Sequence, residues 1–247
     1  METIGRVICY GSATVPASSW YCKKHVSINR LYYIHAGKGG YVHHAKAYPL
    51  RAGRIYFIPY TADFAPFSDA CDPIVHTYMD FELIPPIITD GIISAEASQN
   101  GKISSAASVF ALGGAMSKHC DLSALYQDPP LWELCKASVI YLVNEIASVN
   151  QIPKITDEVV LASLAMMHTK MNEELTVNEI ARKCYMAPDS FIRRFSRAVG
   201  ITPYRYLKSI RLRTAHCLRE AGMSLSQIAS EVGYADASAL AHALKGS

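Results

Sequence analysis

The chain has 247 residues, 50% of them hydrophobic, and a formal net charge of +3. This length accommodates one large domain or two small ones, and the lack of any run of about 18 apolar residues argues against a membrane span. The first residues, METIGRVICYGS, do not have the basic-then-apolar order of a secretory signal, so we expect a cytoplasmic protein with no membrane contact.

The cysteines are scattered along the chain, and none belongs to a Cys-x-x-Cys pair. Pairs with that spacing are typical of zinc and redox sites. We therefore expect unpaired thiols in a reducing compartment, and no metal or other cofactor.

The positive charge is concentrated near the C-terminus. The stretch from Arg193 to Arg219 contains eight basic residues and no acidic one. Such one-sided charge suits a surface that faces phosphate groups, although a solvated helix face has the same composition. Charge alone leaves these two interpretations open.

Strand-like segments dominate residues from about 5 to 83. They are rich in Tyr, Ile, Val and Phe, and glycines separate them, which predicts a β-sandwich or barrel. These segments are RLYYIHA, GGYVHHAKAY, GRIYFIP and IVHTYMDFEL.

Beyond Pro85 the composition becomes rich in Ala, Ser and Leu, which predicts helices at about 104–118, 130–149 and 156–171. The second of these helices has an apolar face that can pack on the barrel or on a second copy of the chain. We place Leu131, Leu134, Ile140, Val143 and Ile146 on that face.

A helix-turn-helix pattern occurs twice in the C-terminal third. Thr176 and Glu179 have the spacing of a helix-capping box, and Ser224 and Gln227 repeat it 48 residues later. Each box opens a short amphipathic helix that is followed by a turn and a second helix. A helix from Pro203 to about Ala221 joins the two pairs.

The second helix of each pair is the candidate for the major groove of DNA. Phe191 and Phe195 lie one turn apart and are expected to face the core, so the opposite side is free to contact DNA. Arg193 is the best candidate for a base contact, and Arg194 and Arg197 for phosphate contacts. The complete set of candidate DNA contacts is Asp189, Ser190, Ile192, Arg193, Arg194, Arg197, Ser238 and His242.

The segments LTVNEIARKC, FIRRFSRAVGITPYRYLKSIRLRTAHCLREAG and LSQIASEVGYADASAL resemble the DNA-binding module of AraC/XylS transcription regulators. The resemblance implies an α+β protein with an N-terminal cupin-like β-barrel, a helical linker and a C-terminal all-α double helix-turn-helix. The corresponding ranges are 1–85 for the ligand-sensing barrel, 86–152 for the linker and dimerisation region, and 153–247 for the DNA-binding domain.

The sequence departs from the family pattern at two places. The Pro-Gly-Asp turn of the sensor domain is replaced by Ala52, Gly53 and Arg54. The module usually continues past the second recognition helix, whereas this sequence ends at ALAHALKGS. We therefore expect the second helix pair to be incomplete, to lack a packing partner, and to leave DNA recognition mainly to the first pair.

The sensor domain is expected to bind a small molecule. His76 and Tyr78 share one strand face by period two, and they match positions at which sugar-sensing relatives contact their ligand. Trp20, Tyr33 and His35 are added because aromatic and polar groups together suit a small polar ligand. These side chains can equally fill the barrel core.

A metal site of the cupin type is not expected. His43 and His44 are adjacent, and adjacent residues of a strand point to opposite faces, so both cannot enter the barrel. No serine lies in a Gly-x-Ser-x-Gly turn either.

The resemblance implies a homodimeric regulator, not an enzyme, that binds double-stranded promoter DNA under the control of a sugar or another metabolite. Two alternatives remain at this point: a ligand-binding and dimerisation protein whose DNA domain is too incomplete to bind operators, and a barrel enzyme with a helical appendage.

Overall fold

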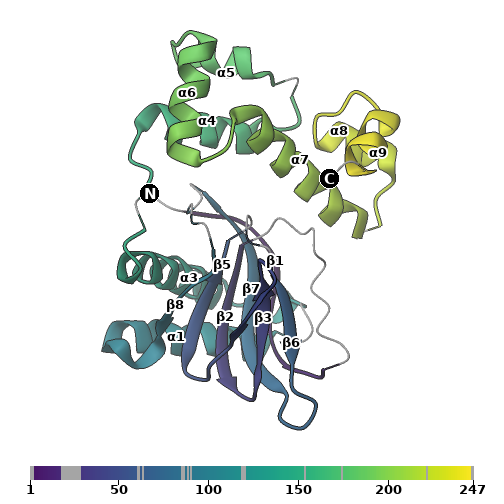
Figure 1. The fold of residues 1–247 in the computed structure, drawn as a ribbon. Coiled ribbons are helices and arrows are strands. Elements are labelled where there is room, and N and C mark those ends of the chain that lie inside the picture. The colour runs from purple at the N-terminus through teal and green to yellow at the C-terminus, as the bar shows by residue number, and fades with distance from the viewer. Residues whose placement is uncertain are drawn as a thin grey trace. The chain divides into compact units, whose positions relative to one another are not determined.

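The structure is a computed structural model. It describes residues 3–17, 29–59, 62, 64–84, 87, 89, 91–117, 121–152, 154–173, 175–220 and 222–245. Trp20 lies outside these residues. The chain divides into two compact units, the first drawn from residues 1–153 and the second extending over 154–247 (Figure 1).

The first unit contains two antiparallel sheets. The larger sheet has the strand order β1-β7-β2-β5-β8, and the smaller has the order β4-β3-β6. The strands are β1 (Thr3–Val15), β2 (Asn29–Ala36), β3 (Gly39–His43), β4 (Lys46–Pro49), β5 (Arg54–Ile58), β6 (Ala65–Ser68), β7 (Ile74–Ile84) and β8 (Ile93–Glu96).

Side-chain alternation along the strands builds two cores, one on each face of the larger sheet. On β7, Ile74 belongs to a cluster that also includes Tyr41 of the smaller sheet, whereas Met79 and Phe81 point to the other face. On β2, Ile34 belongs to the cluster with Tyr41, and Leu31 belongs to the cluster on the other face. The larger sheet is therefore covered on both sides.

Helices cover the outer face of the larger sheet. They are α1 (Gly101–Met116), α2 (Ser123–Tyr126) and α3 (Pro129–Val149), and a short 3₁₀ turn, η1 (Ala97–Gln99), precedes them. The side chains of Asn100 and Asp128 accept backbone hydrogen bonds at the starts of α1 and α3. Phe110 and Leu142 are fully buried in one cluster with the strands.

This packing corrects the expected helical linker over residues 86–152. Strand β8 lies within that range and pairs with β5, and α1 and α3 share a core with the sheet, so the region is part of the first unit. Sequence composition did not reveal β8 because only four residues form it. The predicted apolar face of α3 is also partly wrong: Leu134 is 51% exposed, whereas Cys135 and Val139 are buried.

Cys71, Cys135 and Cys184 are free thiols, as expected, but Cys9 is disulfide-bonded, so the expectation of unpaired thiols is wrong for that residue. None of the described helices is both long and apolar enough to cross a membrane. Among the described residues, no group of three or more His, Cys, Asp or Glu side chains is arranged to hold a metal ion.

The second unit is helical. Its helices are α4 (Glu158–Thr169), α5 (Val177–Lys183), α6 (Pro188–Val199), α7 (Pro203–Glu220), α8 (Leu225–Glu231) and α9 (Ala237–Lys245). Figure 1 shows α7 as the long connection between a group formed by α4, α5 and α6 and a group formed by α8 and α9.

Both predicted capping boxes are present. The Thr176 hydroxyl accepts a hydrogen bond from the Glu179 amide at 3.2 Å, and the Glu179 carboxylate accepts one from the Thr176 amide at 2.8 Å. Ser224 and Gln227 make the equivalent bonds at 3.4 and 3.2 Å. The start of α5 and the start of α8 are therefore fixed by local sequence.

Each helix pair has its own core. In the first group the rings of Phe191, Phe195 and Tyr206 are in contact, with centroid distances of 5.8 Å for both successive pairs. In the second group Leu240 of α9 is fully buried in a cluster with Leu212 of α7. The expectation that the second pair lacks a packing partner is thus wrong, because α7 supplies one.

Candidate nucleic-acid interface

Helix α6 has one buried and one exposed side. Phe191 and Phe195 are fully buried, whereas Asp189, Arg193 and Arg197 are exposed. Pro188 stands in the first turn, and Gly200 ends the helix with φ +80°. Because the two phenylalanines hold one side in the core, the exposed residues form a continuous ridge at helical spacing.

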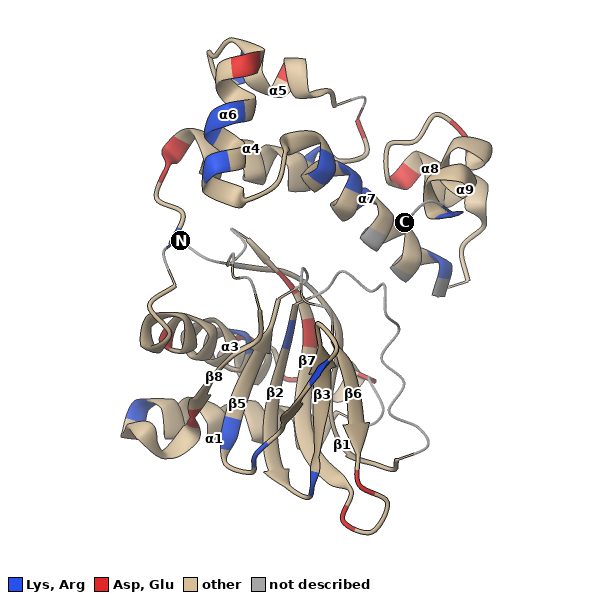
Figure 2. Cartoon of the chain, in the orientation of Figure 1, with Lys and Arg blue, Asp and Glu red and all other residues tan. Residues whose placement is uncertain are grey.

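A hollow of about 420 Å³ lies beside this ridge. Its lining residues are Asp157, Ser190, Arg193, Arg194, Arg197 and Ala198. The Arg193 guanidinium reaches the Ser190 hydroxyl only at 3.5 Å, so this bond hardly restrains it. Figure 2 shows the basic positions along α6 and α7. Of the other predicted contacts on α6, Ser190 and Ile192 are half-buried.

Arg194 makes an ion pair that its sequence context did not predict. Its Nε lies 2.6 Å from Oδ2 of Asp157, and Oδ1 of Asp157 accepts hydrogen bonds from the Val159 and Val160 amides at the start of α4. The bond from Arg194 and these amides lower the pKa of Asp157 despite some desolvation. In this structure Arg194 therefore ties α6 to α4, and its phosphate contact stays a prediction.

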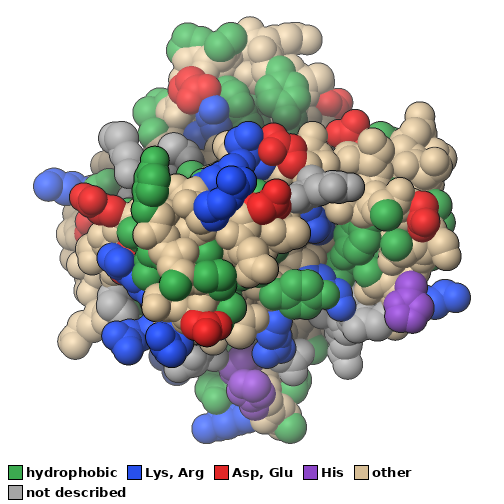
Figure 3. Space-filling view, turned by 90° about the horizontal axis from the view of Figure 1, so that it is seen from above, with side chains coloured by type: hydrophobic (Ala, Val, Ile, Leu, Met, Phe, Trp, Pro, Cys, Tyr) green, Lys and Arg blue, Asp and Glu red, His purple; other side chains and the backbone are tan. Residues whose placement is uncertain are grey.

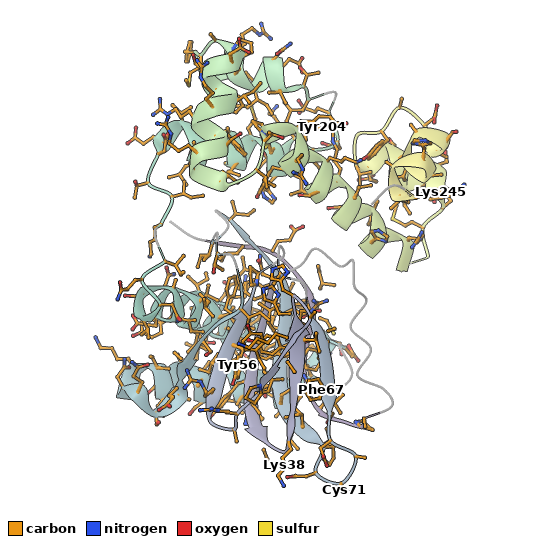
Figure 4. The ribbon with its side chains drawn as sticks, viewed as in Figure 1. Lys38, Tyr56, Phe67, Cys71, Tyr204 and Lys245 are labelled. Atoms are coloured by element: carbon orange, nitrogen blue, oxygen red, sulfur yellow. The ribbon has the colours of Figure 1, made fainter. Side chains whose placement is uncertain are left out.

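Helix α9 presents a weaker version of the same ridge. Ser238 and His242 are exposed on the side opposite the buried Leu240. Lys245 follows at the next helical step and is also exposed; Figure 4 labels it. Sequence reasoning missed Lys245, although its i+3 spacing from His242 was available as a signal.

The turns of the two helix pairs share an unusual backbone conformation. Tyr185 in the first turn has φ +55°, and Gly233, located 48 residues later, has φ +73°. This left-handed region is easily adopted by glycine but is unfavourable for tyrosine. The Tyr185 side chain is 98% exposed, so packing within the unit does not compensate for the strain.

The predicted ligand residues of the first unit lie on opposite faces of the larger sheet. His76 and Tyr78 face the smaller sheet, with ring centroids 5.2 Å apart, and Tyr32 is 4.8 Å from His76. Burial, followed by the charge of nearby His35, lowers the pKa of His76 to about 4. His76 is therefore neutral at physiological pH.

Tyr33 and His35 do not join that group. Tyr33 packs against the core beneath the helices, and Nε2 of His35 lies 2.8 Å from the hydroxyl of Thr77. In the β2–β7 register Tyr33 is opposite Thr77 and Ile34 is opposite His76, which places these pairs on different faces. The structure thus places His76 and Tyr78 together on one face of the larger sheet, and it places Tyr33 and His35 together on the other face.

Near the first group, Arg30 and Asp80 form an ion pair of 3.3 Å between two mostly buried side chains. Burial raises the pKa of Asp80, and Arg30 opposes that rise.

Figure 3 shows that basic and acidic side chains alternate in small groups on one face of the molecule, so charge on that face is mixed.

Residues 174–246 match a family model described as a helix-turn-helix domain. An AraC-like transcription regulator of Streptomyces antibioticus is 36% identical over 92 residues, which cover 37% of this chain and 30% of the relative. An AraC-like transcription regulator of Streptomyces lividans is 34% identical over 92 residues, which again cover 37% of this chain and 30% of the relative. The matched segment thus spans less than a third of these curated relatives.

The fold of the whole chain is similar to that of ToxT from Vibrio cholerae. A structure of ToxT with a bound unsaturated fatty acid aligns with a TM-score of 0.56 at 10% identity, covering 100% of this chain and 90% of ToxT. A second ToxT structure gives 0.56 at 11% identity, with coverages of 100% and 93%. The C-terminal part of the chain is therefore a helix-turn-helix domain of the AraC type, preceded by a sheet-rich unit with the fold found in ToxT.

Proposed function

We propose that this chain is a sequence-specific transcription regulator that inserts α6 into the major groove of promoter DNA. The observation that carries the proposal is the two-sided character of α6. Phe191 and Phe195 anchor it in the core, and Arg193 and Arg197 extend from the opposite side. An α-helix with its side chains is about 10–12 Å wide and fits the major groove of B-DNA.

The arginines of α6 have different tasks in this proposal. Arg193 is exposed and weakly held, so its guanidinium is free to pair with the two acceptor atoms of guanine. Arg197 is one turn further along and suits a phosphate contact. Arg194 is bonded to Asp157 and sets the position of α6 relative to α4.

Helix α7 separates the two helix pairs. Its 18 residues extend about 27 Å at 1.5 Å per residue, and the helices it joins add to that length, so their span is comparable with the roughly 34 Å of one DNA turn. A second contact through α9 in the neighbouring groove is therefore within reach. The exposed residues there, Ser238, His242 and Lys245, offer less for base recognition than Arg193, so we propose that α6 carries most of the sequence specificity.

We also propose that the first unit binds a small organic molecule, such as a sugar or another metabolite. His76, Tyr78 and Tyr32 support this because they place polar atoms within an aromatic cluster between two sheets. The unsaturated fatty acid in the ToxT structure gives a second ligand class to test. We further propose that two copies of the chain act together on DNA.

The purified full-length chain should be used to capture fragments of genomic DNA, and the affinity for an enriched fragment should be measured by fluorescence anisotropy at several salt concentrations. We expect the logarithm of the affinity to fall linearly with the logarithm of the salt concentration, because phosphate contacts release counterions. Failure to enrich any fragment, or an affinity independent of salt, would favour a ligand-binding protein that does not act on DNA.

A further inference from the structure

A cavity of about 400 Å³ lies within the helical unit, away from the exposed ridge of α6. Segments from three parts of the unit line it: the start of α5, the first half of α7, and the turn between α8 and α9. The lining residues are Leu175, Thr176, Val177, Asn178, Tyr204, Leu207, Lys208, Arg211 and Tyr234. Figure 4 labels Tyr204, which lies in the first turn of α7.

The cavity combines an apolar floor with aromatic edges. Leu175 and Leu207 are buried, with 5% and 4% of their surfaces exposed. Tyr204 is 65% exposed and Tyr234 is half-buried. A large exposed aromatic ring beside a buried aliphatic floor favours a flat, apolar ligand body, and the volume lies within the range of small-molecule sites.

Both charged side chains that line the cavity are basic. Arg211 donates from Nε to the Met171 carbonyl and from Nη2 to the Glu173 carbonyl, each at 2.9 Å. A guanidinium has five N–H donors, so these two bonds orient the group and leave other donors available. Lys208 is half-buried one turn earlier on α7. A carboxylate is the group that such a pair of cations would attract.

The cavity lies at the junction of the two helix pairs. Besides holding the loop after α4, Arg211 lies against the turn that contains Gly233: a Cβ atom added there would be 2.8 Å from Nη2 of Arg211. The same Cβ would be 2.3 Å from the Met171 carbonyl oxygen. The turn at Gly233 thus lies against Arg211 and the loop after α4, and a molecule in the cavity would contact both helix pairs.

We propose that this cavity is a binding site for a small aromatic carboxylate, separate from any ligand site in the sheet unit. The carboxylate pairs with Lys208 and Arg211, and the ring lies between Tyr204 and the leucine floor. An occupant touches both helix pairs and therefore changes how they are spaced for two neighbouring grooves. That last consequence rests on the proposed DNA binding, whereas ligand binding itself does not.

The alternative occupant is a phosphate of the DNA backbone. Lys208 and Arg211 suit a phosphate as well as a carboxylate, but a phosphate would leave the apolar floor and the tyrosines without a role. The lining therefore favours the aromatic ligand, and competition between an aromatic carboxylate, inorganic phosphate and DNA separates the two occupants.

Indole-3-acetate is a suitable probe, because indole-3-acetamide has nearly the same shape without the negative charge. Binding to the isotope-labelled full-length chain, in the absence of DNA, is followed by methyl and amide chemical shifts. We expect indole-3-acetate to produce saturable shifts at Val177 and Leu207. Indole-3-acetamide and inorganic phosphate should each bind at least about tenfold more weakly, because each lacks one of the two recognised features.

Two variants test the assignment of the cation. Lys208→Gln should weaken indole-3-acetate binding about tenfold, whereas Lys183→Gln, which removes an exposed charge from α5 outside the cavity, should leave it unchanged. The proposal is overturned if indole-3-acetate produces no saturable shifts at the cavity, or if both variants bind it like the wild type. It is also overturned if only a DNA duplex, and not indole-3-acetate, perturbs Val177 and Leu207.

Discussion

Gly233 is the residue at which the contact between the two helix pairs can be tested by a single added methyl group. The Gly233→Ala substitution has two costs. The first is the left-handed backbone, φ +73°, which alanine adopts at a cost of about 1–2 kcal/mol. Reduced entropy of the unfolded chain offsets about 0.4–1 kcal/mol of that cost. The second cost is steric and is specific to this site.

The steric cost follows from the two distances at the added Cβ atom, 2.3 Å to the Met171 carbonyl oxygen and 2.8 Å to Nη2 of Arg211. Neither contact can be relieved without moving backbone or the Arg211 guanidinium, which donates to the carbonyls of Met171 and Glu173. Losing one hydrogen bond from a charged donor costs about 1.5–3 kcal/mol. We therefore expect Gly233→Ala to lower the free energy of unfolding of the helical unit by about 3 kcal/mol in total.

Gly222→Ala is the matched control. Gly222 has a similar backbone conformation, φ +84°, but nothing lies within 4 Å of an added Cβ atom. This variant should lower the free energy of unfolding by only about 0.5–1 kcal/mol, because it carries the backbone cost alone. The difference between the two variants isolates the contact between the helix pairs.

The assay is urea unfolding of the full-length chain, followed by circular dichroism at 222 nm, with hydrogen exchange on peptides from α7 and α8 to assign the change to the helical unit. Equal destabilisation by Gly233→Ala and Gly222→Ala would refute the reasoning, because the steric contact would then contribute nothing.

Three further predictions concern single sites. Tyr185→Asn should raise the free energy of unfolding by about 0.5–1 kcal/mol in the same urea assay, because asparagine tolerates φ +55° better and the tyrosine ring is almost fully exposed. A decrease would show that the tyrosine ring makes a stabilising contact in solution. Thr176→Ala should cost about 1 kcal/mol through loss of the cap of α5, and faster hydrogen exchange should be confined to that helix; unchanged exchange would contradict the capping role. Burial lowers the pKa of His76 to about 4, whereas this histidine in the unfolded chain takes up a proton below about pH 6.5. The free energy of unfolding should therefore fall by about 3 kcal/mol as the pH is lowered from above 6.5 to 4. His76→Phe should flatten this pH dependence in unfolding titrations, and an equally steep dependence in the variant would refute the assignment.

Local sequence was sufficient to predict the features that depend on neighbours along the chain. The two capping boxes and the inward positions of Phe191 and Phe195 follow from spacings of three or four residues, and the structure confirms them. The segment GGYVHHAKAY, in contrast, was expected as one strand-like stretch, and the structure divides it into β3 and β4, with left-handed residues His44 and Ala45 at the turn.

Features that depend on distant partners were not predictable in this way. Asp157 and Arg194 are 37 positions apart, and no short-range pattern joins them. Strand β8 was not predicted because a segment of four residues is too short to show a strand pattern in the sequence. It forms a strand by pairing with β5.

The ligand residues of β2 illustrate a different limit. This strand is buried on both faces, so alternation of polar and apolar residues does not tell which face meets the smaller sheet. Residue type alone, an aromatic ring and a polar group, suggests Tyr33 and His35 as ligand contacts beside His76 and Tyr78, whereas the register places them on the opposite side of the sheet.

Whether α6 reads DNA through Arg193 is tested most directly by the affinity of full-length variants for a captured DNA fragment, measured by fluorescence anisotropy at fixed salt. We predict that Arg193→Ala weakens binding by about tenfold or more, while His242→Ala on α9 and Lys102→Ala on α1 have much smaller effects. Full affinity in Arg193→Ala, with binding lost in His242→Ala, would contradict the account.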